Sequence, residues 1–313
     1  MLSRTAETLY WLARYVERAE NTARIIDGAA RLSAMPAAYA GGSNEWEKAI
    51  AACGSGDLFQ RLYGEANQQT VVEFLGFSTE NPSSIRVCLE NARHNARAVR
   101  TALTIEMWEA INGAWLEMKR FSPESMTRTK LQEFLSFVKE ANLRFDGSAY
   151  RTMLRDDAYD FFQLGVYIER ADATARIIDA KCSVFDEKEE SPGGGHDYFQ
   201  WTALLRSVSA LTSYHWVYRQ SIKPDLVADL LILNRRMPRS IASCYENITR
   251  RLDLLARGYG RPGPSQRLAY DIYDRLNDND IRSVMRTGLH RFLTEVIDDN
   301  NRLGAAITEQ YLV

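Results

Sequence analysis

Proline, cysteine and histidine are all scarce in this chain of 313 residues, and each shortage excludes a class of protein. With only eight prolines, few positions interrupt a helix. The cysteines stand singly, with no CxxC spacing, so neither a disulfide scaffold nor a cysteine-rich zinc site is expected. We expect reduced thiols, as in a cytoplasmic protein, at Cys53, Cys88, Cys182 and Cys244.

Long apolar runs and a strong net charge are missing as well. No stretch approaches the roughly 18 apolar residues of a membrane-spanning helix. The opening "MLSRTAETLYWLARYVERAE" carries charges throughout, unlike a signal peptide. A net charge of −2 and an isoelectric point of about 6.2 favour neither nucleic acid nor an acidic membrane as partner. The expected compartment is therefore the cytoplasm.

What the chain does have is a helical pattern of apolar residues. Leu12, Val16, Ala19, Ala23 and Ile26 recur at helical spacing, and no stretch alternates as a strand would. We predict an all-α fold. The expected helices cover residues 3–32, 44–53, 57–77, 82–119, 123–145, 155–186, 196–221, 224–235, 238–257, 265–276 and 279–303.

One segment occurs twice. Residues 12–27 and 164–179 share 11 of 16 positions at an offset of 152. "PSSIRVCLEN" (82–91) and "PRSIASCYEN" (238–247) share Pro, Ser, Ile, Cys and Glu-Asn at an offset of 156, and a fainter match follows in the same order. We therefore predict a tandemly duplicated helical bundle with pseudo-twofold symmetry, its repeats at 1–150 and 151–313 around one continuous core.

Glycine and proline mark the expected connections. The segments 35–46 and 191–201 are rich in glycine and should be loops. Pro82 and Pro238 should stand in the first turn of equivalent helices. "RGYGRPGPSQR" (257–267) is expected to be a long solvated loop, with an anion site as the alternative.

Charged residues accompany the duplicated apolar stripe. Each copy has acidic and basic side chains on one helical face: Glu17, Glu20, Arg24 and Asp27 in the first, Glu169, Asp172, Arg176 and Asp179 in the second. One interpretation is a ladder of salt bridges that sets the register between the halves. The other is a polar pocket where both copies converge on a ligand. Either constraint preserves the same residues.

The second repeated block adds a Glu-Asn pair to each half, Glu90-Asn91 and Glu246-Asn247. If these helices pack against the first, four acidic side chains meet: Glu17, Glu90, Glu169 and Glu246. Arginines would have to balance them, because an unbalanced cluster titrates at raised pKa.

A di-metal carboxylate site is a weak alternative. That class uses Glu-x-x-His on two helices, whereas Glu90 and His94 have the wrong spacing and no counterpart in the second copy. We therefore expect no metal and no cofactor. Cys88 and Cys244 are equivalent but have no histidine at fixed spacing, so we expect them to be core residues rather than nucleophiles.

The strings "LYWLARYVERAENTARIID" and "FFQLGVYIERADATARIID", with "NPSSIRVCLENARHNARAVR", resemble the bacterial alpha-E family over essentially the whole chain. The resemblance implies two all-helical repeats. It places the family's glutamate and arginine signature on Glu17, Arg18, Glu20 and Arg24 and on their equivalents Glu169, Arg170, Asp172 and Arg176. Asp172 in place of glutamate, and Val166 opposite Arg14, are departures between the copies.

The resemblance also implies partners. Alpha-E proteins look like companions of circularly permuted ATP-grasp proteins and of transglutaminase-like proteins that make or cleave amide bonds on peptides. The leading hypothesis is therefore a non-catalytic scaffold that binds such a ligase or its peptide substrate. The alternatives are an enzyme that acts on peptides or amides through the Glu/Arg cluster, and a carboxylate metal-binding bundle.

Overall fold

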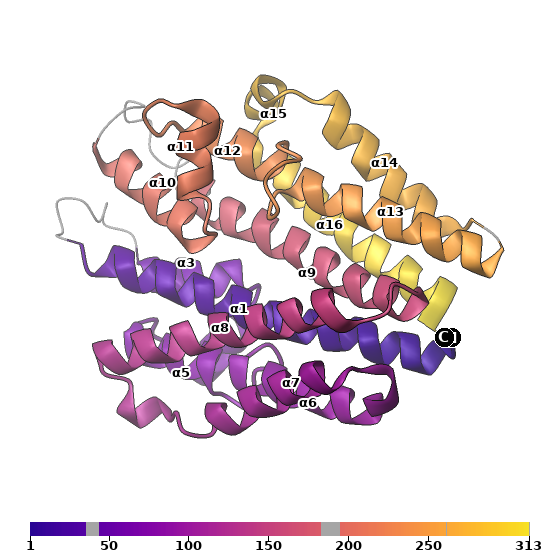
Figure 1. Ribbon diagram of the computed structural model, residues 1–313. Coiled ribbons are helices and arrows are strands. Elements are labelled where there is room, and N and C mark those ends of the chain that lie inside the picture. The colour runs from indigo at the N-terminus through magenta and orange to yellow at the C-terminus, as the bar shows by residue number, and fades with distance from the viewer. Residues whose placement is uncertain (36–43, 183–194, 261, 313) are drawn as a thin grey trace.

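The computed structural model describes residues 1–35, 44–182, 195–260 and 262–312. Within these ranges the chain is all-α, and no strand occurs. Figure 1 shows helices packed above and below a central pair, with both chain termini at one end of the molecule. The predicted fold class is therefore confirmed.

The helices of the N-terminal half account for most of its described residues. They are α1 (Ser3–Ser33), α3 (Glu45–Ala52), α4 (Gly56–Leu62), α5 (Gln68–Gly76), α6 (Ile85–Ala98), α7 (Ile105–Met118) and α8 (Arg128–Thr152). Two short 3-10 turns lie between them, at Arg100–Ala102 and Pro123–Ser125.

The C-terminal half has a similar succession. Its helices are α9 (Asp157–Cys182), α10 (Gly195–Ser207), α11 (Leu211–Tyr218), α12 (Pro224–Ile232), α13 (Ile241–Tyr259), α14 (Pro264–Asp278), α15 (Ile281–Thr287) and α16 (Leu289–Ile307). A π-helical turn, Thr308–Leu312, ends it.

Helices α1 and α9 form the centre of the molecule and make its most extensive interhelical contact. On α1 pack α6 and α8, and on α9 pack α13 and α16 (Figure 1). Helix α10 of the C-terminal half contacts α1, while α3 contacts both α1 and α9. The partners of α1 and α9 correspond in part, because α3 also contacts the long helix of its own half and α10 has no comparable contact with α9 among the described residues. The pseudo-twofold axis and the repeat boundaries stay predictions.

Small residues let α1 and α9 approach closely. A Cβ added at Gly165 would lie 2.3 Å from the Tyr10 carbonyl oxygen and 3.0 Å from Cβ of Ala13. The contact with the Tyr10 oxygen is too short for any Cβ and the contact with Ala13 is tight, so the crossing in this geometry requires glycine. The close approach places the polar residues that follow on each helix within reach of the other helix.

Apolar side chains pack on both sides of the central pair. One cluster joins the N-terminal half to the start of α9, and includes Phe162 and Val166. The other joins the C-terminal half to the start of α1, and includes Ala6 and Tyr10. Each half therefore buries part of the other half's long helix.

Four predicted helices are each divided in two. Residues 57–77 form α4 and α5, and residues 82–119 break around Val99–Thr104, where Thr104 caps α7 by accepting from Met107 N at 3.3 Å. Residues 196–221 break at Ser209 (φ 56°), and residues 279–303 break at Gly288 (φ 105°). Left-handed backbone conformations end a helix even where the apolar period continues.

The two prolines lie outside the helices that they were predicted to begin. Helices α6 and α13 begin at Ile85 and Ile241, after the N-cap serines Ser84 and Ser240. Ser84 Oγ accepts from Val87 N at 3.3 Å, and Ser240 Oγ accepts from Ser243 N at 3.0 Å. A serine hydroxyl satisfies a free backbone amide, which proline in the first turn does not do.

The predicted loops are shorter than expected. Residues 36–43 and 191–194 of these segments lie outside the described residues, but Glu45-Trp46 belongs to α3 and residues 195–201 belong to α10. The expected long loop at 257–267 is wrong: α13 continues to Tyr259 and α14 begins at Pro264. Gly260, with φ 78°, ends α13 in the left-handed conformation.

Candidate functional site

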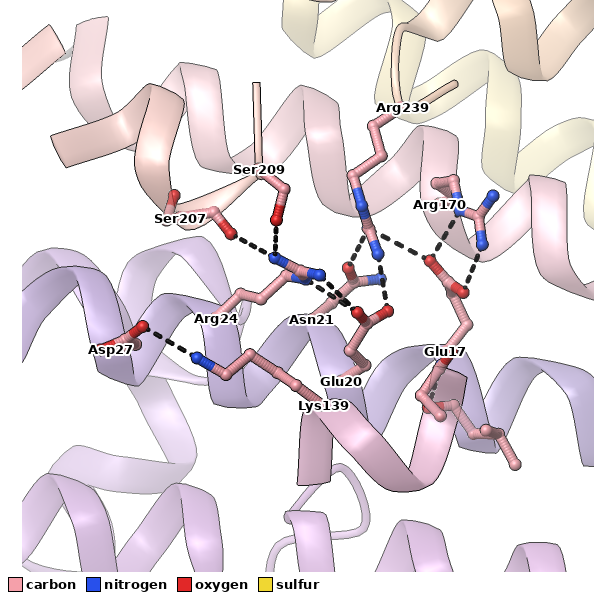
Figure 2. Close-up of polar contacts among 12 residues, drawn as sticks. Glu17, Glu20, Asn21, Arg24, Asp27, Lys139, Arg170, Ser207, Ser209 and Arg239 are labelled. Carbon is pink, nitrogen blue, oxygen red and sulfur yellow. Dashed lines mark hydrogen bonds and ion pairs between the residues drawn. The ribbon is translucent and has the colours of Figure 1, made fainter. Parts of the chain in front are cut away.

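The glutamate of each Glu-Arg pair binds the arginine of the other pair. Glu17 on α1 accepts from Arg170 on α9, with Nε to Oε1 at 2.8 Å and Nη2 to Oε2 at 2.9 Å (Figure 2). Glu169 on α9 accepts from Arg18 on α1, with Nε to Oε1 at 2.6 Å and Nη2 to Oε2 at 2.9 Å. Two-pronged pairs of this kind fix both distance and orientation. We call them the reciprocal pairs.

A second arginine supports each glutamate. Arg14 Nε donates to Glu169 Oε2 at 2.8 Å. Arg239, which precedes the N-cap of α13, reaches Glu17 Oε1 at 3.4 Å. Each glutamate is thus held by two guanidinium groups.

Glu20, fully buried on α1, extends the network around Glu17. Its Oε2 accepts from Arg239 Nη2 at 2.6 Å, and its Oε1 accepts from Arg24 Nη2 at 2.6 Å (Figure 2). Arg24 Nη1 also donates to Ser207 O at 2.8 Å and to Ser209 Oγ at 2.9 Å. Arg24 therefore links α1 to the end of α10.

The matching positions in the second copy make fewer contacts. Arg176 Nε donates to Asp172 Oδ2 at 2.7 Å, the counterpart of the Arg24–Glu20 pair. Arg176 lies over Gly54, which follows α3 as Ser209 follows α10 and also has a positive φ. Asp172 Oδ1 is buried and has no hydrogen-bond partner among the described residues.

The electrostatics of the two glutamates is dominated by burial and by arginine. Burial raises the pKa of Glu17, but the charges of Arg170 and Arg239 lower it by more, to about 2. Burial acts in the same way on Glu169, and Arg18 and Arg14 lower its pKa to about 2. Both carboxyls are therefore anionic at neutral pH, and their oxygens are already occupied by guanidinium donors.

Less completely paired carboxyls behave in the opposite way. Burial raises the pKa of Asp172, and the charge of Arg176 offsets this only in part. Burial also raises the pKa of Asp146 on α8, against the charge of Arg170. The incompletely paired carboxyl groups are thus those of the aspartates around the network, and not those of its glutamates.

The predicted four-carboxylate cluster does not form. Glu90 and Glu246 are exposed, and no described contact joins either to Glu17 or Glu169. Asn91 is half-buried without a described side-chain bond, and Asn247 Nδ2 donates to its own helix at Ser243 O, 2.9 Å away. These residues lie two turns along α6 and α13, on faces turned away from the central pair.

The outer carboxylates of the stripe bind other elements. Asp27 accepts from Arg31 Nε and from Lys139 Nζ, both at 3.0 Å, which ties α1 to α8. Asp179 Oδ1 lies 2.5 Å from His290 Nδ1 of α16. They fasten the flanking helices to the central pair.

The two equivalent cysteines, Cys88 and Cys244, lie in the buried core. Burial raises the pKa of Cys88 and Cys244 to about 12, so both thiols stay protonated. No group of three or more potential metal ligands gathers in the portion of the chain that the structure describes.

Sequence reasoning did not identify Arg239 as a member of the network. The signal was present, because Ser83 and Arg239 are a mismatch inside the second repeated block. It was not decisive, because only the fold brings residue 239 within 3.4 Å of a helix more than 200 positions earlier. Arg14 was noted only as a difference from Val166, and its partner Glu169 is likewise set by the helix crossing.

The two reciprocal pairs form a clamp that holds α1 and α9 together. Glu-Arg occurs in this chain only at 17–18 and 169–170, and these four residues bind one another across the helix crossing. The salt-bridge interpretation of the charged stripe is what this geometry supports. A general base needs a pKa near the working pH and a free oxygen, and the two glutamates offer neither.

Comparison with known proteins identifies the same two-residue motif. The Alpha-E family model, described as a predicted alpha-helical domain with a conserved ER motif, matches residues 1–312. Uncharacterized proteins of Mycobacterium bovis and of two Mycobacterium tuberculosis strains are each 22% identical over 317 residues. The alignments cover 94% of this chain but only 35% of each relative, so the chain spans about a third of their length.

No solved structure matches the chain significantly. No helix among the described residues has the length and apolar character needed to cross a membrane. The family match extends over both Glu-Arg pairs and over every helix of the fold. The chain belongs to the Alpha-E family.

Proposed function

We propose that this chain is a non-catalytic helical subunit that binds an ATP-grasp-type amide or peptide ligase, or the ligase's peptide substrate. The resemblance to alpha-E proteins suggests the identity of the partner. Two features of this chain support a binding role, namely the occupied glutamates and the exposed apolar side chains. The architecture of its relatives supports it as well.

The observation that carries the proposal is a set of four exposed apolar side chains on segments that meet near the start of α9. Leu2 is 78% exposed, Leu154 75%, Tyr150 69% and Ile105 63%. We call these four residues the terminal patch. Apolar side chains that are exposed together in one area of a protein commonly mark a site of contact with another protein.

Polar contacts hold the elements of the terminal patch together. The amino group of Met1 lies 2.9 Å from Asp157 Oδ2 at the start of α9. Thr104 Oγ1 and Thr152 Oγ1 are 2.8 Å apart and join the start of α7 to the end of α8. The guanidinium group of Arg155 lies over the Tyr150 ring, 4.9 Å from its centroid. These contacts hold the segments that carry the terminal patch in fixed positions relative to one another.

The longer relatives support a binding role in a second way. In each of them the matched region is 35% of the polypeptide, so most of the chain lies outside it. A domain that occurs beside other segments of one polypeptide commonly contacts them. We infer a corresponding contact for this chain, whether its partner is a separate protein or not.

The test is co-purification of the tagged chain with the circularly permuted ATP-grasp protein of the same genome, followed by size-exclusion chromatography at micromolar concentration. A stable complex is expected. Leu154→Glu should weaken it by about tenfold or more, since a charge at an apolar contact costs over 1 kcal/mol. Trp216→Glu on α11, where the side chain is 72% exposed, is the matched control.

Separate elution of the two wild-type proteins, with no bound peptide, would overturn the proposal. Equal weakening by Leu154→Glu and Trp216→Glu would remove the patch as the contact. The enzymatic alternative makes a different prediction: Glu17→Gln and Glu169→Gln would abolish amide chemistry and leave the melting temperature unchanged. The two-pronged arginine contacts of both glutamates favour the opposite result.

A further inference from the structure

A pocket of about 260 Å³ lies beside Glu169. Helices α1 and α9 and the residues after α3 form its wall. The side chains that matter for its chemistry are those of Arg14, Arg18, Asn21, Ser83, Asp172 and Arg176. We call it the Glu169 pocket.

The pocket exists because one arginine of the first network has no equivalent here. On the Glu17 side, Arg239 fills the space and bonds to Glu17, Glu20 and Asn21. The sequence match pairs Arg239 with Ser83, whose short side chain leaves the corresponding space open. The serine that binds Arg24, Ser209, is likewise matched by Gly54, which offers Arg176 no hydroxyl.

The charge of the pocket is one positive unit. Arg14, Arg18 and Arg176 face the carboxylates of Glu169 and Asp172. Both prongs of Arg18 are used on Glu169, but Arg176 donates only through Nε among the described contacts. Each guanidinium has five N–H groups, so the pocket keeps free donors for an anion.

Two buried polar atoms at the pocket wall lack partners among the described residues. Asn21 is 4% exposed, and its Nδ2 makes no hydrogen bond. Its Oδ1 accepts from Arg239 Nη1 at 3.1 Å, which sets the orientation of the amide. Asp172 Oδ1 is the other such atom. A buried polar atom without a partner costs about 1–3 kcal/mol, which a bound ligand would recover.

The two atoms need different partners. Asn21 Nδ2 is a donor and requires an acceptor, as do the free N–H groups of Arg176. Asp172 Oδ1 is an acceptor and requires an N–H or O–H donor. A ligand that satisfies both carries a carboxylate next to a donor group. At about 30 Å³ per water, the pocket has room for a molecule of a few heavy atoms beyond the carboxylate.

We propose that the Glu169 pocket binds a small carboxylate whose α-carbon carries an amino or hydroxyl group. The carboxylate accepts from Asn21 and the arginines, and the amino or hydroxyl group donates to Asp172. The pocket lies further along α1 and α9 than the terminal patch, so its occupancy is independent of the proposed partner.

Calorimetric titration of the full chain with L-alanine, L-lactate and propionate tests the proposal. At least one of the first two should bind about tenfold more tightly than propionate, which lacks the donor. Asp172→Asn, which replaces the free acceptor and keeps the shape, should remove that preference. A purely structural role for Asp172 would not alter ligand selectivity.

Ser83→Arg introduces the side chain that Arg239 provides in the Glu17 network. It should fill the Glu169 pocket and lower the affinity for the ligand by tenfold or more. Ser136→Arg, at an exposed position of α8, is its control and should bind as the wild type does. Tighter binding of L-alanine than of L-lactate would identify an amino acid as the ligand, and the reverse order would identify a hydroxy acid. Absence of binding at millimolar ligand, equal affinity for propionate, or binding unaffected by Ser83→Arg would each overturn the proposal.

Discussion

At the scale of single residues, the decisive feature is that the buried charges are matched across two helices. Glu17 is 2% exposed and Glu20 is fully buried, and each is held by two arginines. A buried ion pair contributes little net free energy over an apolar pair of the same shape. Loss of one partner is costly, because the other charge then stays buried and alone.

Glu17→Gln should therefore destabilise the chain by about 3 kcal/mol or more, because Arg170 and Arg239 lose their anion in a buried site. Urea unfolding followed by circular dichroism measures the change. The control is Glu133→Gln, whose partner Lys130 is 52% exposed, and which should cost less than about 1 kcal/mol. Equal stability of Glu17→Gln and the wild type would show that the clamp is not structural.

The same pairs predict a loss of stability in acid. The pKa of Glu17 and Glu169 is about 2 in the fold, below the ordinary glutamate value of 4.5. The unfolded chain therefore binds protons first, and the stabilisation, present above pH 4.5, is lost as the pH falls toward 2. Asp146 and Asp172, with raised pKa, act in the opposite direction at higher pH.

The difference in unfolding free energy between the wild type and Glu169→Gln isolates this effect from the aspartates. It should be large at neutral pH and shrink at about pH 3, since the wild-type unfolded state then becomes protonated. Urea unfolding of both proteins at the two pH values is the measurement. A difference that does not depend on pH would contradict the assigned pKa.

At the scale of elements, the crossing of α1 and α9 depends on the absence of a side chain at Gly165. Gly165→Ala should destabilise the chain by about 1–3 kcal/mol or more, because its Cβ would meet backbone at 2.3 Å and the helices must separate. Thermal unfolding measures this. Gly147→Ala on α8, where a Cβ meets nothing within 4 Å, should instead be neutral or stabilising.

Asparagines repeat the reciprocal arrangement between the outer helices and the central pair. Asn142 Nδ2 on α8 donates to Val16 O at 3.2 Å, and Asn300 Nδ2 on α16 donates to Ile168 O at 3.1 Å. The faint third sequence match pairs these two asparagines. Their bonds fix the outer helices to equivalent positions on α1 and α9.

At the scale of the whole molecule, neither half buries its own long helix completely. The start of α9 belongs to the apolar cluster of the N-terminal half, and the start of α1 belongs to that of the C-terminal half. Residues 1–150 alone would expose the apolar crossing and the buried Glu17 and Glu20 of α1.

We therefore expect fragments 1–150 and 151–313 to be poorly folded or self-associated when separate, and to form a helical complex when mixed. Size-exclusion chromatography and circular dichroism of the fragments, alone and together, check this. A stable monomer of 1–150 would show that the halves are independent domains. It would also require α1 to satisfy its charges without Arg170 and Arg239.

The all-α class and the extent of the long helices could be predicted from local pattern. The first helix was expected at 3–32 and occupies Ser3–Ser33, because its apolar period and lack of proline are properties of consecutive residues. Helix breaks at Ser209 and Gly288 were missed, since a left-handed residue interrupts the backbone without interrupting the apolar period.

The sequence by itself determined that two copies of a helix carry the same glutamates and arginines, because repetition is visible without coordinates. Only the tertiary structure decided which charges meet. The close contact at Gly165 pairs Glu17 with Arg170 and Glu169 with Arg18, brings in Arg239, and leaves Glu90 and Glu246 in solvent. Charges pair only where they are close in space. The angle and register of two packed helices set that distance, and the order of residues along the chain does not give it.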